Sequence, residues 1–587
     1  MNTNGRTAGS VAVAMPLLIN GLLSSVALAQ VQADPATIRY YVSDLGEFPS
    51  CSTRASYRAT AINDCGVIVG YVEEGPSHVC VNHGWVWSLC GTYGVAPRTL
   101  IDLSLAAGDS ELSQAWDVNS SGCVVGAQSI QGVTRPIVWR VDQYSAGTIP
   151  RVILGNNQQG EAHGINDPTT TAPAPIVVGW TTTGTFGTTD LAFKHVFGVD
   201  GNTTLTPLNP FGDDHDSRAF DVTTPTATTP APWVGGFSGF VVVGQSCAEQ
   251  VPNDAVRWAL SGTSAAAGLR EDFLPSSSPL NLQLWDAKVN AANVNRYFAG
   301  TFRDPSAVIP CKYRAGFWRS DGTAIDLWAS APAALQGSDS QAYGMSAADS
   351  AGLGLLVVGA ETSAVKGALW WRASTPSSPG SASFVTRRAD DLCFAGNGST
   401  WQLYEFQDVN SQGWLVGQGL HVLGGTTDPA RVHAFLLAPV PQTPNCLAEL
   451  TGDGVINGAD LGVLTGDWTP PGTTCSGCCL SDLNHDLQVN AGDLGILLGA
   501  WGGTCTAADL AAQSCAPSCL PPLQMESAVM SLVEGAQEVP SLDSPVAMVM
   551  AGFGFSNLNE FTAWLDAQPS TAQANVLATL DAILGGQ

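Results

Sequence analysis

The feature that most constrains the fold is a degenerate unit that recurs seven times between residues 38 and 440. Its first half is Ala-x-x-Ile/Val-Asn, a turn and an apolar run that ends in glycine, as in ATAINDCGVIVGY from Ala59. Its second half is a short run with an aromatic residue, as in HGWVW from His83. The first halves begin at Ala59, Ala115, Ala162, Ala219, Ala287, Ala342 and Phe406, and the second halves at His83, Arg135, Lys194, Asp254, Arg314, Lys366 and Val432. A chain that repeats one short unit in this way folds as an array of equivalent modules.

The composition of the unit indicates β-structure. Its apolar runs, such as residues 67–69 and 241–243, are short, β-branched and bounded by Gly or Asn turns, which favours buried strands over helices. A period of roughly 45–65 residues with about four short strands per unit is typical of a β-propeller blade. We therefore expect a mainly β fold, with a seven-bladed β-propeller-like body over residues 38–440.

The two ends of the array predict how the ring closes. Several units finish with an Asp-Leu strand, as at residues 100–103, whereas the last unit stops at HAFLL without one. The chain begins with an unassigned strand of that kind, Ile38–Leu45 (IRYYVSDL). We expect this N-terminal strand to complete the last blade, because closure removes the exposed edge that an open array leaves.

The units resemble the HAF repeat of bacterial extracellular proteins, whose hallmark is A-x-x-I-N-x-x-G-x-[IV]-V-G followed by His-Ala-Phe and an aspartate-leucine strand. His433-Ala434-Phe435 is the literal form, and the copies at Ala219 and Ala342 have lost the asparagine. The resemblance implies fold, export and repetition, and it implies no chemistry.

Residues 446–505 contain two copies of a loop followed by a short amphipathic helix. Oxygen-bearing side chains fall at positions 1, 3, 5, 9 and 12 of an EF-hand-type loop, and position 7 supplies a backbone carbonyl. In the second copy these positions are Asp482, Asn484, Asp486, Asn490 and Asp493, with Gln488 at position 7. In the first copy they are Glu449, Thr451, Asp453, Asn457 and Asp460, with Val455 at position 7. The spacing predicts calcium, because a hard dication takes six or more oxygens from one curled segment; the alternative is an Asp/Asn/Gly-rich turn without metal.

The duplicated loop-helix pair resembles a type I dockerin, the calcium-dependent module that joins secreted proteins to cohesin domains. Aspartate at position 12 of both loops matches dockerins, whereas positions 10 and 11, where dockerins carry recognition residues, are glycine or alanine here (residues 458–459 and 491–492). The resemblance implies a small all-α, EF-hand-like module with calcium as cofactor and a cohesin-like extracellular partner. Because Glu449 and Thr451 are poorer ligands than Asp and Asn, we expect the second loop to be the better site.

The N-terminus indicates export. Residues 1–29 combine Arg6, an apolar run and Ala27-Leu28-Ala29, which is the pattern of a cleaved secretory signal peptide. No later segment is apolar and long enough to span a bilayer, so we expect a secreted or cell-surface protein. The 15 cysteines suit an oxidising compartment, and the CxxCC cluster of Cys475, Cys478 and Cys479 favours disulfides, with zinc as the alternative.

The charge and the C-terminal end add two further expectations. A formal charge of −27 at pH 7 disfavours nucleic acid and anionic membranes as partners, because both are recognised through Lys and Arg. Residues 520–587 carry apolar residues at helical spacing, as in AQANVLATLDAIL from Ala572. They predict a helical C-terminal tail.

No catalytic constellation stands out in the sequence. Residues 213–216 (DDHD) cluster acid and imidazole groups but suit a solvated loop. Recurrent tryptophans such as Trp85 and Trp139 suit core packing between blades, with a carbohydrate-stacking platform as the alternative. We therefore expect a secreted, calcium-binding, non-enzymatic binding or display protein that docks through its dockerin-like module. Two alternatives are a dockerin-borne polysaccharide-degrading propeller enzyme of the glycoside hydrolase type and a structural cell-envelope or adhesion component.

Overall fold

The computed structural model describes residue 35 and residues 38–505, apart from 49–50, 52–54, 74–81, 90, 107–111, 146, 157, 170–171, 184–188, 199–202, 209–215, 227–230, 240–253, 261–268, 273–287, 294, 304–311, 321–323, 330–338, 347–353, 373–383, 396–400, 422–430, 441–443, 452, 470–480 and 484–487. The predicted signal peptide (1–29), the CxxCC cluster, residues 213–215 and the predicted helical tail (520–587) lie outside the described residues. Within those described, no helix is long and apolar enough to cross a membrane.

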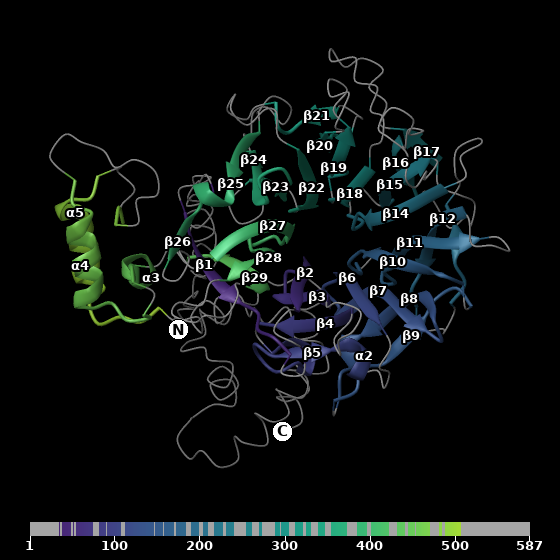
Figure 1. Ribbon diagram of the computed structural model, residues 1–587, viewed down its shortest axis with the longest axis horizontal. Coiled ribbons are helices and arrows are strands. Elements are labelled where there is room, and N and C mark those ends of the chain that lie inside the picture. Colours follow the sequence, from purple (N-terminus) through teal and green to yellow (C-terminus); the bar gives the residue numbers. More distant parts are fainter. Residues whose placement is uncertain are drawn as a thin grey trace, which may run out of the picture.

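Seven sheets are arranged as blades around a central axis, which confirms the seven-bladed propeller (Figure 1). Blade 1 contains β2 (Ser56–Ile62), β3 (Val67–Glu73), β4 (His83–Ser88) and β5 (Leu100–Asp102), followed by the short helix α2 (Leu103–Ala106). Blade 2 contains β6 (Ser113–Val118), β7 (Cys123–Ile130), β8 (Val133–Arg140) and β9 (Arg151–Ile153), and blade 3 contains β10 (Gly160–Ile165), β11 (Ile176–Thr183), β12 (Thr189–Val196) and β13 (Thr206–Pro207). Blade 4 contains β14 (Asp216–Val222), β15 (Trp233–Gly239), β16 (Asp254–Ala259) and β17 (Leu269–Asp272).

The remaining three blades follow the same order. Blade 5 contains β18 (Lys288–Ala292), β19 (Phe298–Arg303), β20 (Tyr313–Trp318) and β21 (Ala324–Asp326), and blade 6 contains β22 (Ser340–Met345), β23 (Leu355–Glu361), β24 (Lys366–Arg372) and β25 (Val385–Arg388). Blade 7 contains β27 (Trp401–Val409), β28 (Leu415–His421) and β29 (Arg431–Pro439), and it is completed by β1 (Arg39–Asp44) and β26 (Cys393–Ala395). The first strand of each repeat is innermost, and these inner strands contact one another all the way round the ring (Figure 1).

The ring closes through the N-terminal strand, as the repeat ends predict. β1 pairs antiparallel with β29, with Asp44 opposite Phe435, and its other edge pairs parallel with β26. The seventh sheet therefore combines the beginning and the end of the propeller, and both edges of β1 are covered.

The glycine that ends each apolar run is required by a bulge in the neighbouring inner strand. The register between β6 and β7 shifts between Ala115 and Asp117. The shift brings the carbonyl oxygen of Gln114 to within 2.0 Å of where a Cβ atom at Gly126 would lie. Any side chain at that position would displace the inner strand, so the repeat keeps the one residue without a Cβ.

The aromatic residue in the second half of each unit packs between blades. Four tryptophans at equivalent positions are fully buried: Trp139, Trp258, Trp318 and Trp370. Trp87 holds this position in blade 1 and is buried, as is Trp85 two residues before it. Trp139, for example, lies in one apolar cluster with Val69 of blade 1 and Val124 of blade 2. The expected core packing is confirmed, and these buried rings offer no face on which a sugar could stack.

The asparagine of the repeat joins each blade to the next. The Asn63 side-chain amide donates to the carbonyl of Asn119 at 2.9 Å, and Asn119 donates in turn to Asn166 at 3.1 Å. At the closure, Asn410 donates to the carbonyl of Asn63 at 3.3 Å. In blades 4 and 6, Thr223 and Ser346 replace the asparagine, and their hydroxyls still accept from a backbone N–H of their own blade at 2.8 and 3.0 Å. A hydroxyl caps its own turn but is too short to span the seam.

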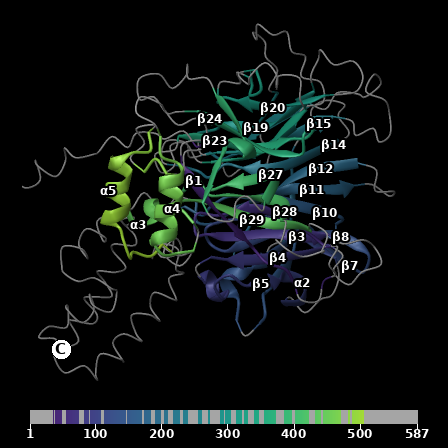
Figure 2. The same ribbon diagram turned by 60° about the vertical axis from the view of Figure 1, so that its left-hand side comes forward.

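Among the residues described after the propeller there are three short helices, α3 (Pro444–Ala448), α4 (Gly458–Gly466) and α5 (Ala491–Gly499). They enclose a small aliphatic core that includes Leu464 and Leu497. A disulfide between Cys446 and Cys505 joins the first helix to the end of the segment. We call residues 444–505 the helical module; it lies beside β1 of the closing blade (Figure 2).

Candidate functional site

The two loop-helix copies of the helical module brace each other in an approximately symmetric way. Ile456 and Val489 are the eighth residues of their loops. The backbone N–H of Gly502, just after α5, donates to the Ile456 carbonyl at 2.9 Å, and the N–H of Thr469, after α4, donates to the Val489 carbonyl at 3.0 Å. Each loop is thus held by the segment that follows the other copy's helix.

The predicted ligands of the first loop converge. Carboxylate oxygens of Glu449, Asp453 and Asp460 all lie within 4.8 Å of one another. The Thr451 hydroxyl lies between two of them, donating within 3.2 Å of Glu449 Oε1 and of Asp460 Oδ1. Glu449 and Asp460 are fully buried, whereas Asp453 is exposed. Four of the six predicted positions therefore face one small volume at the edge of the module.

The other two positions of this loop are held by the cap of α4. The Asn457 Oδ1 atom accepts from the N–H of Ala459 at 2.7 Å, which is a helix N-cap. Its Nδ2 atom donates to Asp453 Oδ2 and to the Val455 carbonyl, each at 2.9 Å. Hydrogen bonds from Asn457 and from the Val455 N–H lower the pKa of Asp453. The loop is therefore pre-curled, with Gly454 at a φ of 82° in its turn.

The second loop repeats this geometry wherever the structure describes it. Asp493 accepts from the N–H of Leu483 at 2.7 Å and from that of Asn490 at 2.8 Å. These bonds match those of Asp460 in the first loop, which accepts from two equivalent backbone groups at 2.7 and 2.8 Å. Asp482 and Asp493 are buried and Gln488 is half-buried. Asn484 and Asp486, the third and fifth positions, lie outside the described residues.

The donor set of the first loop fits calcium. Its side-chain donors are carboxylate and hydroxyl oxygens only, which suits a hard cation and not a metal that prefers nitrogen or sulfur. Burying Glu449 and Asp460 close together costs free energy unless nearby positive charge neutralises them. A bound calcium ion would supply that charge.

The first loop also contacts the propeller. The guanidinium of Arg39, on β1, donates to the carbonyl oxygens of Leu447 and, at 3.4 Å, of Glu449. The Tyr41 hydroxyl donates to Glu449 Oε2 at 3.3 Å. Burial lowers the pKa of Arg39 to about 10. Burial and the Glu449 charge together raise the pKa of Tyr41. The strand that closes the ring therefore also anchors the predicted metal loop.

Three aspartates at the propeller axis were not predicted. Asp117, Asp221 and Asp408 project from the inner strands of blades 2, 4 and 7. Each accepts a backbone N–H from the next blade, at 2.8 Å from Ile165, 2.7 Å from Ala292 and 2.9 Å from Ile62 respectively. Burial, and then the charge of Asp408, raises the pKa of Asp117 to about 7, and burial raises that of Asp408 to about 6. Burial and the charge of Asp117 also raise the pKa of Asp221.

A pattern in the sequence could have identified these three aspartates. The position before Ile or Val in the repeat reads Ala61, Asp117, Gly164, Asp221, Ala291, Gly344 and Asp408 around the ring. Each aspartate is followed in the ring by a blade with alanine or glycine at this position, which leaves room for the carboxylate to cross the seam. Aligning the seven units by this column would have found the pattern.

Aromatic side chains form a ladder that begins on β3 of blade 1 and continues along the inner strands of blades 2 to 4. Tyr71 contacts Trp116 edge-to-face at 5.4 Å, Trp116 stacks on His163 at 5.0 Å, and His163 meets Phe220 at 5.2 Å. Glu161 Oε2 lies 2.9 Å from His163 Nε2. Burial alone would raise the pKa of Glu161, but its contacts with His163 lower it overall. This half-buried face combines ring surfaces with an acid–imidazole pair.

Comparisons with known proteins do not assign the chain. No family model and no curated protein matches it. Among solved structures, the α-L-arabinofuranosidase PaAbf62A from Podospora anserina in complex with cellotriose shares 9% identity and a TM-score of 0.26, covering 69% of this chain and 98% of that one. The tricorn protease shares 8% identity and a TM-score of 0.32, covering 73% and 39%. The catalytic domain of a Coprinopsis cinerea GH62 α-L-arabinofuranosidase shares 10% identity and a TM-score of 0.24, covering 69% and 98%. Likenesses at these scores carry no functional argument, and the propeller assignment rests on the strand pairing above.

Proposed function

We propose that this chain is a secreted, calcium-binding, non-enzymatic binding or display protein whose helical module folds on calcium and docks to an extracellular partner. The observation that carries the proposal is the convergence of Glu449, Asp453 and Asp460 within 4.8 Å around the Thr451 hydroxyl. Their spacing in the sequence matches an EF-hand-type loop, and the second copy repeats it.

The carboxylates of the first loop would bind the ion from different sides. Buried Glu449 and Asp460 would form the fixed side of the site, and exposed Asp453 would close it from solvent. Bound calcium supplies positive charge that neutralises these carboxylates. Asp460 also accepts backbone N–H groups on both sides of the loop, so the loop and the start of α4 become ordered together. Asp493 links the second loop to α5 in the same way.

Calcium stoichiometry tests the binding step. We expect the full chain to bind two calcium ions, Asp453→Asn or Asp486→Asn one, and the double variant none, as measured by calorimetric titration. Asp453 is exposed, so its amide variant should fold. Asp390→Asn is the matched control, because it removes an exposed carboxylate that pairs only with Lys366 on the propeller. Two ions bound by the double variant would refute the assignment.

Exposed tryptophans support the docking step. Trp468 and Trp501 occupy equivalent positions after α4 and α5, and they remain 43% and 46% exposed. Exposed large rings at paired positions suit a protein interface. We expect a cohesin-type domain to bind the immobilised full-length protein in the presence of calcium and to be released by chelator. The double variant Trp468→Ala plus Trp501→Ala should no longer bind this domain. Chelator-insensitive binding would contradict docking through this module.

The aromatic ladder on the propeller axis favours a second candidate function, carbohydrate binding or hydrolysis by the propeller. Sugars stack on aromatic rings, and the Glu161–His163 pair offers an acid and a base beside Trp116. A glycan array and an assay for released sugars test it. Binding lost in Trp116→Ala with no release would make the face a lectin-like site, and release abolished by Glu161→Gln would make it enzymatic. Neither binding nor release would remove this candidate.

A further inference from the structure

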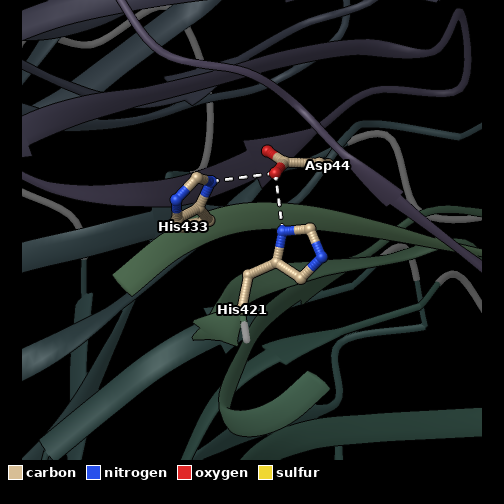
Figure 3. Close-up of side chains that lie close together, drawn as sticks. All are labelled: Asp44, His421 and His433. Atoms are coloured by element: carbon tan, nitrogen blue, oxygen red, sulfur yellow. Dashed lines mark hydrogen bonds and ion pairs between the residues drawn. The ribbon is translucent and has the colours of Figure 1, made fainter. Parts of the chain in front are cut away.

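A cluster of histidine and carboxylate side chains lies at the seam where the propeller closes (Figure 3). Asp44 ends β1, His421 ends β28, and His433 lies on β29. Glu47 follows β1 by three residues. These strands come from opposite ends of the propeller sequence, so the cluster exists only when the ring is closed.

The donor atoms are close enough to share an ion. Asp44 Oδ2 lies 2.9 Å from His433 Nδ1 and 3.1 Å from His421 Nδ1, and all three donors lie within 4.8 Å of one another. Four ligands of a tetrahedral zinc ion lie about 3.3 Å apart, given metal–ligand distances of about 2.0–2.1 Å. The two distances from Asp44 would need to lengthen by only a few tenths of an ångström to accept the ion.

His433 is the unusual member of this cluster. Its side chain is 6% exposed, and both ring nitrogens lie 2.9 Å from carboxylate oxygens, Nδ1 from Asp44 and Nε2 from Glu47. Within the described part of the chain, neither contact has hydrogen-bond geometry and neither nitrogen finds another hydrogen-bond partner. A buried imidazole with poorly satisfied nitrogens between two acids is costly as a simple ion pair.

Blade 1 shows what the repeat needs at this position. His83 and Asp102 occupy the same register as His433 and Asp44, since Asp102 lies opposite Trp85 and Asp44 opposite Phe435. There His83 Nδ1 makes a normal hydrogen bond of 2.6 Å to Asp102. Among the described residues, that pair belongs to no cluster of three metal-ligating groups. The second histidine at the seam is therefore an addition to the repeat.

We propose that Asp44, His421 and His433 bind a divalent transition metal of the zinc class, with Glu47 as the outer partner of His433. Two imidazole nitrogens and one carboxylate suit zinc and its neighbours and disfavour calcium. Metal-bound histidines commonly donate a hydrogen bond from their second ring N–H to a carboxylate, and Glu47 would accept this bond from His433. Arg431 in turn donates to both Glu47 oxygens at 3.1 and 3.2 Å. Trp401 stacks on His421 at 4.3 Å with an interplanar angle of 7° and orients that ring.

Three protein ligands leave one coordination position for water or for a small ligand. The ion would also tie β1 to β28 and β29. Metal binding is therefore coupled to closure of the ring, and it should raise the melting temperature of the propeller.

The test titrates the full-length protein, saturated with calcium, with cobalt(II) and then with zinc in a competition assay. We expect one cobalt ion to bind. Its visible absorption spectrum should be that of cobalt with nitrogen and oxygen ligands, without thiolate charge-transfer bands. His421→Ala and His433→Ala should each weaken zinc at least about 10- to 100-fold, the range that loss of an outer partner alone produces. His83→Ala, which removes the equivalent imidazole in blade 1, should bind zinc normally.

Two readouts keep the outcome decisive. If His433→Ala fails to fold, His421→Ala serves, because its ring lies nearer solvent at the end of a strand. The calcium double variant Asp453→Asn plus Asp486→Asn should retain zinc, which separates this site from the module. Unchanged zinc affinity in His421→Ala, or a thiolate spectrum, would overturn the proposal.

Discussion

The propeller and the helical module hold their buried carboxylates in different ways. At the propeller seams, neutral amides and hydroxyls such as Asn63 and Ser346 bond to backbone beside a core of tryptophans. The seam carboxylates of Asp117, Asp221 and Asp408 each accept a backbone N–H from the next blade. The helical module has a small aliphatic core and buries three carboxylates completely, those of Glu449, Asp460 and Asp493. We therefore expect the stability of the module to depend on bound calcium more than the stability of the propeller does.

Removal of calcium should give the largest difference between the two regions. Under a calcium-selective chelator we expect amide protons of residues 446–505 to lose their exchange protection and those of the propeller strands to keep it, because both predicted calcium loops lie in the module. Hydrogen exchange with mass spectrometry measures both regions in one sample. Equal protection with and without chelator would show that the disulfide and the aliphatic core suffice for the module.

The free energy that a tryptophan contributes through packing should differ between the two regions. Trp139→Ala should destabilise the propeller by about 3–5 kcal/mol, because the ring is fully buried between blades. Trp501→Ala is its matched control, since that ring is 46% exposed on the module, and it should change stability by less than about 0.5 kcal/mol. Urea unfolding of the two variants checks the difference, and similar costs would mean that Trp501 is covered in solution.

The asparagine side chains that bond to the next blade should contribute less to the free energy of unfolding. Asn119→Ala removes both the donor to Asn166 and the cap of its own turn, and we expect a loss of about 1–3 kcal/mol. Asn119→Ser imitates blade 6, keeps the cap and should lose about half as much. Urea midpoints measured on both variants separate the seam from the cap; identical losses would assign the whole effect to the turn.

A pH dependence of the propeller is also expected. The folded-state pKa values of about 7 for Asp117 and about 6 for Asp408 exceed the unfolded value of about 3.9. The folded state therefore binds these protons more tightly, and stability should fall as pH rises from about 4 to about 7. We expect a higher urea midpoint at pH 5 than at pH 8, with a smaller difference in Asp117→Asn. A variant that keeps the full difference would exclude Asp117 as its source.

Features that depend on short spacings in the sequence could be predicted, and contacts between distant residues could not. Strand positions and the metal loops depend on spacings of a few residues, so Val67 to Val69 and Asp453 to Asp460 could be placed directly. Ring closure was predictable because the last unit lacks a strand that the first residues supply. The contacts of Arg39 with the module could not be predicted, since no spacing links residues so far apart.

The missed residues were hidden in positions that the repeat leaves variable. Asp117 and its two equivalents differ from the alanine or glycine of other blades, and their role depends on the neighbouring blade's backbone. His433 matched the repeat signature and so looked structural. Its partner His421 lies outside the signature, and Asp44 joins them only through closure.

The closing strand β1 also sets an order of events in time. Its residues are synthesised before those of the other described strands, yet their partners on β29 and on the module are the last of the described chain to be made. At about 5–20 residues per second, β1 waits on the order of tens of seconds for β29. During that interval both of its edges are available to other chains, so slow or interrupted synthesis should favour exchange of β1 between molecules.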